Sequence, residues 1–158
     1  MGELTEADKA NIRAVWEKLA ADPEGNGRTV VLRLFTDYPE TKKYFKHFKN
    51  ISTQEEMQNS AQIKRHGKTV MNKLTSIFEK LDDWAAVCCI LDTMAERHVF
   101  VHTVEVYNFQ IIFDLIVAIM AESLGSTFTP EIRESWVKIF NIIYLYLEEC
   151  YKKHQTTP

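Results

Sequence analysis

The sequence predicts an all-α fold in a single domain spanning residues 1–158. The chain has 158 residues but only 5 Gly and 4 Pro, so few turns interrupt it. Apolar residues recur at spacings of three and four through most of the chain, which is the pattern of amphipathic helices. No segment alternates apolar and polar residues as a half-buried strand does. The length suits one domain with its own core.

Composition and charge narrow the class of protein. Apolar residues make up 46% and charged residues 26% of the chain, which is typical of globular proteins and argues against disorder. The 19 basic and 22 acidic residues give a net charge of −3, so we expect no nucleic-acid partner. The apolar run at 115–121 is too short for a membrane span. Three sparse cysteines and an N-terminus unlike a signal peptide predict a cytoplasmic location.

Capping signals and prolines define the first helices. The segment Thr5–Asp8 resembles a capping box with Asp in place of Glu, so a helix begins there and ends near Asp22. A second helix ends before Pro39, because the residue before a proline disfavours helix. Pro39 suits the first turn of a short helix running towards Phe45. The polar stretch 46–59 predicts a corner with one short helix.

Four longer helices follow, at 60–80, from Asp83, at 104–124 and from Thr129 to about Tyr151. Asp83 is a predicted N-cap, and Gly125 is a predicted C-terminal stop. Thr129, followed by Pro and Glu, is a strong helix start. The polar tail 152–158 is expected to fray.

Two of the five histidines lie on apolar stripes. His66 shares a helix face with Val70, and His98 follows Met94 by one turn. An imidazole there needs a partner, because an unsatisfied buried polar group costs about 1–3 kcal/mol. One interpretation is a pair of core histidines bonded to backbone carbonyls. The other is a ligand shared between the two helices.

A zinc site is a further interpretation of the histidines. His98 and His102 form an H-x-x-x-H pair, a spacing that can place two imidazoles on one metal. The zinc hydrolase version needs Glu after the first His, and Val99 stands there. The sequence also lacks a nucleophile elbow and a glycine-rich phosphate loop, so hydrolysis and phosphoryl transfer are disfavoured.

An ordered set of residues resembles the globin family over essentially the whole chain. The residues that carry the resemblance are Trp16, Gly27, Tyr38–Thr41, Phe45, Phe48, His66–Val70, His98, Val104 and Asn108–Phe109. The separations from Phe45 to His66 (66 − 45 = 21) and from His66 to His98 (98 − 66 = 32) fit the family as well. Segments 59–66 and 135–138 most resemble the vertebrate cytoglobin and globin Y branch. The resemblance implies a globin fold of about eight helices around one haem b, with close helix crossing at Gly27 and Gly67.

The resemblance also implies roles for individual residues. His98 would be the proximal iron ligand, with its other ring nitrogen donating to a carbonyl near Met94. His66 would either donate a hydrogen bond to the dioxygen ligand or act as a sixth iron ligand. The other residues expected to bind the cofactor are Val31, Phe45, His47, Phe48, Val70, Leu91, Met94, Arg97, His102, Val104, Asn108, Phe109, Ile112 and Ile143.

The function that the resemblance implies is reversible binding of dioxygen, for storage, buffering or transport, with NO and CO as further diatomic ligands. The alternative is a haem redox enzyme, either a nitric oxide dioxygenase or a nitrite reductase, with a bis-histidine resting state and a cellular reductant. We see no reductase domain in the chain, so the ligand binder is the expected function.

Overall fold

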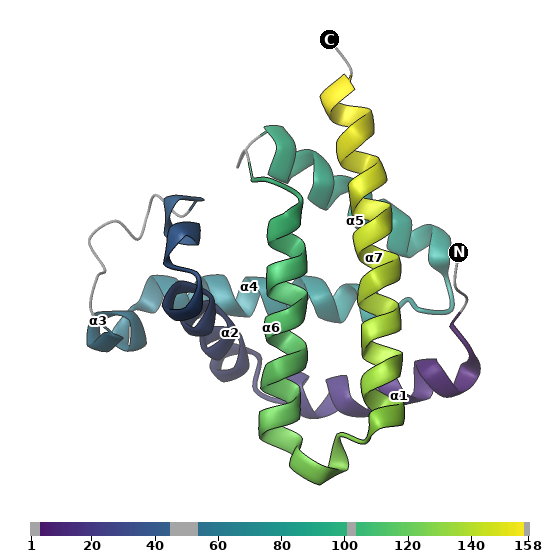
Figure 1. Ribbon diagram of the computed structural model, residues 1–158, viewed down its shortest axis with the longest axis horizontal. Helices are drawn as coiled ribbons and strands as arrows, with labels where there is room; N and C mark the ends of the chain where they lie inside the picture. Colours follow the sequence, from purple (N-terminus) through teal and green to yellow (C-terminus); the bar gives the residue numbers. More distant parts are fainter. Residues whose placement is uncertain (1–3, 45–53, 101–103, 157–158) are drawn as a thin grey trace.

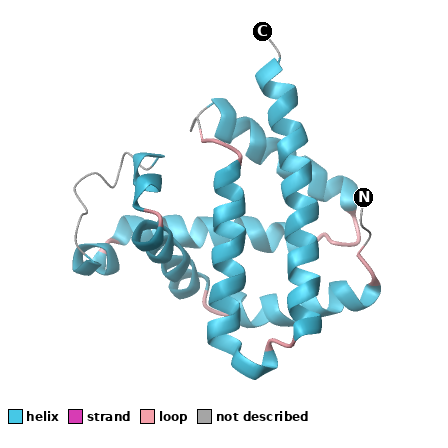
Figure 2. Cartoon of the chain, in the orientation of Figure 1, coloured by secondary structure: helices cyan, strands magenta, loops and turns pink. Residues whose placement is uncertain are grey.

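The computed structural model describes residues 4–44, 54–100 and 104–156. Its elements are α1 (Glu6–Ala20), α2 (Pro23–Asp37), η1 (Pro39–Tyr44), α3 (Gln54–Asn59), α4 (Ala61–Phe78), α5 (Trp84–Phe100), α6 (Tyr107–Leu124), η3 (Gly125–Thr127) and α7 (Pro130–Thr156). The two η elements are 3-10 helices, and no strand occurs within the described ranges (Figure 2). The predicted all-α fold class is confirmed.

Figure 1 shows how the helices are arranged. α6 and α7 run side by side in opposite directions, α1 and α4 cross behind them, and α2 lies to the left of α6. α5 packs mainly against α7, while α2 and α4 share an extensive contact. The larger core cluster takes buried side chains from α1, α2, α4, α5, α6 and α7, and a smaller cluster joins α2, α3, α4 and α6. α4 and α5, which carry His66 and His98, are thereby both anchored to the rest of the bundle.

The helix starts predicted from local signals are confirmed. The hydroxyl of Thr5 accepts a hydrogen bond from the Asp8 amide, and the Asp8 carboxylate accepts one from the Thr5 amide, both at 3.0 Å. Asp83 and Thr129 each accept a hydrogen bond from the amide three residues later, at 3.2 and 3.3 Å. These side chains satisfy amides that the first helical turn leaves without a partner. α2 ends at Asp37, as predicted from the proline that follows.

The predicted start of α6 at Val104 is wrong by three residues, because the helix begins at Tyr107. The backbone of Val104 is used elsewhere: its amide donates to the His98 carbonyl at 2.8 Å, and its carbonyl accepts from the Tyr151 hydroxyl at 2.8 Å. These bonds close the C-terminal end of α5 and hold Val104 outside the next helix. Tertiary bonds have overridden the local apolar pattern here.

The predicted end of the last helix is also too early. α7 continues beyond Tyr151 to Thr156, since no Gly or Pro interrupts this stretch. Lys153 and His154 lie in its last turn, where basic side chains interact favourably with the helix dipole.

α2 and α4 cross at Gly27 and Gly67, both of which are buried. A Cβ atom on Gly27 would collide with the carbonyl group of Gly67, and one on Gly67 would collide with the backbone of Gly27 and Arg28. The predicted close crossing is confirmed, and no larger residue fits at either position without displacing a helix.

α6 is the most apolar helix. The stretch Tyr107–Thr127 has a mean hydropathy of 1.6 and is long enough to cross a membrane by length and composition alone. The short apolar run at 115–121 therefore understated the extent of this segment. Phe113, Ile116 and Met120 are buried in the core beside α7, as expected for the central helix of a helical bundle.

Asp8 joins α1 to α7, and we expect it to stabilise the fold at neutral pH. Its carboxylate accepts hydrogen bonds from Lys138 Nζ at 2.7 Å and Ser135 Oγ at 2.8 Å, and these bonds, Lys138 above all, hold its pKa far below the usual value. A lowered pKa stabilises the fold above the unfolded pKa of about 3.9, and this contribution is lost as the pH falls below that value. Asp8→Asn should therefore lower the free energy of unfolding at pH 7 by about 1–3 kcal/mol.

Urea unfolding at pH 7, 4 and 2.5 measures this effect. The difference between Asp8→Asn and the parent protein should shrink as the pH falls, while Ser135→Ala, which leaves the carboxylate and Lys138 in place, should cost less at pH 7. An equal difference at all three pH values would contradict the electrostatic role of Asp8.

Candidate functional site

His98 lies in the last turns of α5, with its ring held in one orientation. Its Nδ1 is 2.7 Å from the carbonyl oxygen of Met94, one turn earlier. A carbonyl can only accept, so Nδ1 carries the proton and the lone pair of the neutral ring is on Nε2. The ring also packs on Phe109 of α6, with 4.8 Å between the ring centroids. The bond expected between His98 and the Met94 region is present.

The segment after His98 is tied to α7. The amide of Val104 donates to the carbonyl of His98, and the hydroxyl of Tyr151 donates to the carbonyl of Val104. Phe109 lies between these groups, since its ring is edge-on to Tyr151 at 6.1 Å between centroids. His98, Val104 and Phe109, all predicted site residues, thus form one contiguous group.

His66 lies in the first half of α4, directly before Gly67 and one turn before Val70. The side chains of His66 and Val70 are half-buried, and Val70 packs against the larger core cluster. The close crossing of α2 and α4 at Gly67 fixes the position of this part of α4. The contact at Gly67 therefore constrains the backbone of α4 beside His66.

The other apolar predicted residues that the structure describes fall into three groups according to where they pack. The fully buried ones that belong to the larger core cluster are Leu91 and Ile143. Half-buried apolar side chains packed against that cluster are Val70, Met94 and Ile112. Val31 belongs to the smaller cluster, and Ile112 packs against both. The structure thus connects all six through the core.

Two polar predictions stand apart from this group. Asn108 is buried, and its amide donates to the carbonyl of Glu105 at 3.0 Å, so it stabilises the turn before α6. Arg97 is exposed on α5, next to His98. Phe45, His47, Phe48 and His102 lie outside the described residues.

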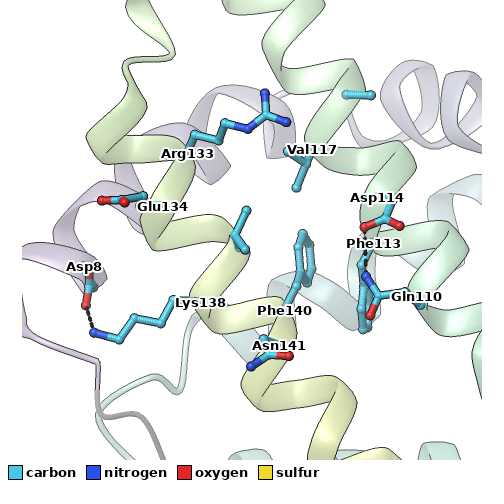
Figure 3. A pocket seen from close by; sticks show the side chains of 12 residues that line it. Asp8, Gln110, Phe113, Asp114, Val117, Arg133, Glu134, Lys138, Phe140 and Asn141 are labelled. Carbon is cyan, nitrogen blue, oxygen red and sulfur yellow. Dashed lines mark hydrogen bonds and ion pairs between the residues drawn. The ribbon is translucent and has the colours of Figure 1, made fainter.

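A hollow of about 730 Å³ lies elsewhere, between α6 and α7 (Figure 3). The stacked rings of Phe113 and Phe140 line it, and charged residues including Asp114 and Arg133 surround it. It includes none of the predicted site residues, and Lys138 at its edge is bonded to Asp8. This hollow therefore includes neither His66 nor His98.

The predicted site residues that the structure describes suit an apolar group that contains a metal ion. One imidazole has its Nε2 lone pair directed by a backbone hydrogen bond, which is the usual arrangement for a metal-binding histidine. Half-buried Val70, Met94 and Ile112 provide apolar surface, and His66 provides a second imidazole from the other helix. Within the described residues no group of three or more His, Cys, Asp or Glu could hold a bare metal ion. A metal carried inside a porphyrin fits this donor set.

Comparison with known proteins decides between these possibilities. The family model described as Globin matches residues 28–147, which is more than half of the chain. The chain belongs to the globin family. Cytoglobin-2 of Danio rerio is 33% identical over 148 residues, covering 94% of this chain and 83% of that protein.

Haemoglobin chains have a similar percentage of residues identical to this globin. Hemoglobin subunit alpha of Danio rerio is 33% identical over 149 residues, and hemoglobin subunit pi of Gallus gallus is 34% identical over 149 residues. Both alignments cover 94% of this chain and 99% of the relative. This globin therefore has haem as its cofactor and binds dioxygen, as the sequence predicted.

The polar contact between α5 and α7 at Asp92 was not predicted from the sequence. Asp92 accepts hydrogen bonds from Tyr146 and Cys150 of α7. The i, i+4 spacing of Tyr146 and Cys150 places them on one face of α7, but the sequence contains no signal for the helix that this face meets.

Proposed function

We propose that His98 is the proximal iron ligand of a haem b and that His66 is the distal hydrogen-bond donor of a reversible dioxygen binder. The 2.7 Å bond from His98 Nδ1 to the Met94 carbonyl carries this proposal, because it fixes the tautomer in which Nε2 can bind iron. The haem supplies the iron at which a diatomic gas can bind reversibly. NO and CO are further ligands of the same chemistry.

The protein's own contribution on the distal side is an apolar wall with a single donor. Val31, Val70 and Ile112 would keep water away from the ligand, since none of their side chains can hydrogen-bond. His66 would donate to the outer oxygen of dioxygen, which carries partial negative charge. Charge-assisted bonds of this kind contribute about 1.5–3 kcal/mol.

Replacing His66 by Leu should therefore raise the dioxygen dissociation rate about tenfold to a hundredfold, the kinetic equivalent of losing that bond. Stopped-flow displacement of dioxygen by CO measures the dissociation rate. The rate of His66→Gln, which retains a donor, should lie between those of the parent protein and His66→Leu. Oxidation of the ferrous protein in air should be slowest in the parent protein, faster in His66→Gln and fastest in His66→Leu. Equal dissociation rates in all three proteins would contradict the distal role of His66.

The optical spectrum of the deoxygenated ferrous protein distinguishes this binder from the redox enzyme. One broad visible band indicates a five-coordinate iron ready for dioxygen, whereas two sharp bands indicate that His66 occupies the sixth position. In the second case ligands must displace His66, which lowers the apparent affinity by the fraction of competent protein. Sustained turnover of NO with a cellular reductant would favour the enzyme over storage or transport.

The cytoplasm is the proposed location of this globin. Cys88, Cys89 and Cys150 are all free thiols, and free thiols are typical of reducing compartments.

A further inference from the structure

Asp92 lies on α5, six residues before His98, and holds this helix against α7. Its Oδ1 atom accepts a hydrogen bond from the Tyr146 hydroxyl at 2.9 Å and another from the Cys150 thiol at 3.1 Å. Both donors come from α7, and Cys150 is only 7% exposed. A carboxylate that receives two hydrogen bonds forms stronger bonds than a neutral acceptor would.

Burial, with a smaller contribution from Asp92, raises the pKa of both partners. Burial and the nearby Asp92 raise the pKa of the Cys150 thiol to about 12. Burial, the Cys88 thiol and Asp92 raise the pKa of the Tyr146 hydroxyl well above its usual value. Both groups therefore remain protonated donors near neutral pH.

A second tie between the two helices lies on the other side of His98. The Tyr151 hydroxyl donates to the carbonyl of Val104, six residues after His98, and the Val104 amide donates to the His98 carbonyl. Asp92 and Val104 therefore attach the segment around His98 to α7 from both directions. Figure 1 shows that α5 crosses behind α7. A helix segment fixed at two points can neither slide nor rotate without breaking a bond.

We propose that Asp92 is a positioning residue: through Tyr146 and Cys150 it fixes α5 on α7 and thereby sets the orientation of the His98 ring towards iron. This inference rests on the proposed role of His98. Groups that orient a metal ligand from outside the coordination sphere change metal affinity about 10- to 100-fold in other proteins. Asp92 would do so through the helix backbone, since it does not touch the ring itself.

Asp92→Ala in the haem-loaded protein tests the proposal. Alanine is a better helix former than aspartate, so any loosening of α5 must come from the lost contact with α7. We expect amide hydrogen exchange in residues 92–98 to accelerate about tenfold, the equivalent of one charge-assisted bond. The iron–histidine stretching band of the deoxygenated protein should shift or broaden, and haem transfer to an excess of a haem acceptor should accelerate.

Two further variants isolate the bond from general stability. Asp92→Asn keeps an oxygen that can accept from Tyr146, so it should largely restore the exchange rates and the stretching band. If Asp92→Ala folds poorly, Tyr146→Phe provides the test instead. This variant removes a single oxygen and should reproduce part of the effect expected for Asp92→Ala. Glu122→Gln weakens a 2.8 Å bond between α6 and Arg33 of α2 and should leave the α5 readouts unchanged.

The outcomes separate this inference from the proposed function. Unchanged exchange in α5 and an unchanged stretching band in Asp92→Ala would overturn the positioning role, whatever happens to overall stability. If the optical spectrum shows five-coordinate iron in the parent protein and the iron–histidine band is still missing, the role of His98 fails instead. In that case the exchange of α5 with and without the variant still tests whether Asp92 anchors the helix.

Discussion

His98→Gly is expected to purify almost free of haem, and added imidazole is expected to restore haem binding. The side chain is the proposed link between the chain and the iron, and its Nδ1 proton is already committed to the Met94 carbonyl. Losing an outer hydrogen-bond partner of a metal ligand costs about 10- to 100-fold in metal affinity, so losing the ligand itself should exceed about a hundredfold. Glycine leaves space beside Phe109 for free imidazole to bind the iron in place of the histidine. Titration of haem into the apoprotein, with and without imidazole, measures both effects.

His66→Gly is the matched control, since it makes the same substitution on α4. It should retain haem without imidazole, because His66 is proposed to act on the dioxygen ligand and not to hold the iron. Haem loss in His66→Gly with retention in His98→Gly would reverse the two assignments. Retention in both single variants and loss in the double variant would mean that either histidine alone can hold the iron.

Much of the fold follows from short-range signals in the sequence. Thr5, Asp83 and Thr129 each place an oxygen where the first amides of a helix need an acceptor, and this requires only residues three apart. The tautomer of His98 is equally local, since its partner is the carbonyl four residues earlier. Such features depend on helix geometry alone, which the apolar spacing already establishes.

The parts that could not be predicted depend on contacts between residues far apart in the chain. Asp92 and Tyr146 are 54 residues apart, and no spacing rule relates two positions on different helices. The start of α6 was misplaced for the same reason, because the backbone of Val104 is held by Tyr151, 47 residues later. The sequence predicts which face of each helix is apolar. The polar residues that meet across a pair of helices can be identified only once the packing of the helices is known.

Gly27→Ala is expected to destabilise the fold strongly, although alanine normally favours a helix by about 1 kcal/mol over glycine. At this position the new methyl group would meet the carbonyl group of Gly67 on α4, and backbone cannot rotate away as a side chain can. Overpacking of a tight contact typically costs about 1–3 kcal/mol and occasionally more, and a contact between two backbones belongs at the upper end. Thermal unfolding of the haem-loaded protein measures the loss. Because His66 adjoins Gly67, the displaced α4 should also change the dioxygen dissociation rate.

Two comparisons identify the cause as steric crowding at the crossing. Gly125→Ala should lose only about 1–2 kcal/mol, since Gly125 has a φ of 55° but no atom lies within 4 Å of a Cβ placed there. Gly27→Ala combined with Gly67→Ala should cost less than the sum of the two single variants, because both methyl groups force the same separation of α2 from α4. Additive losses would mean that each glycine is required for a separate reason. A wild-type dissociation rate in Gly27→Ala would show that the crossing stabilises the fold without setting the position of His66.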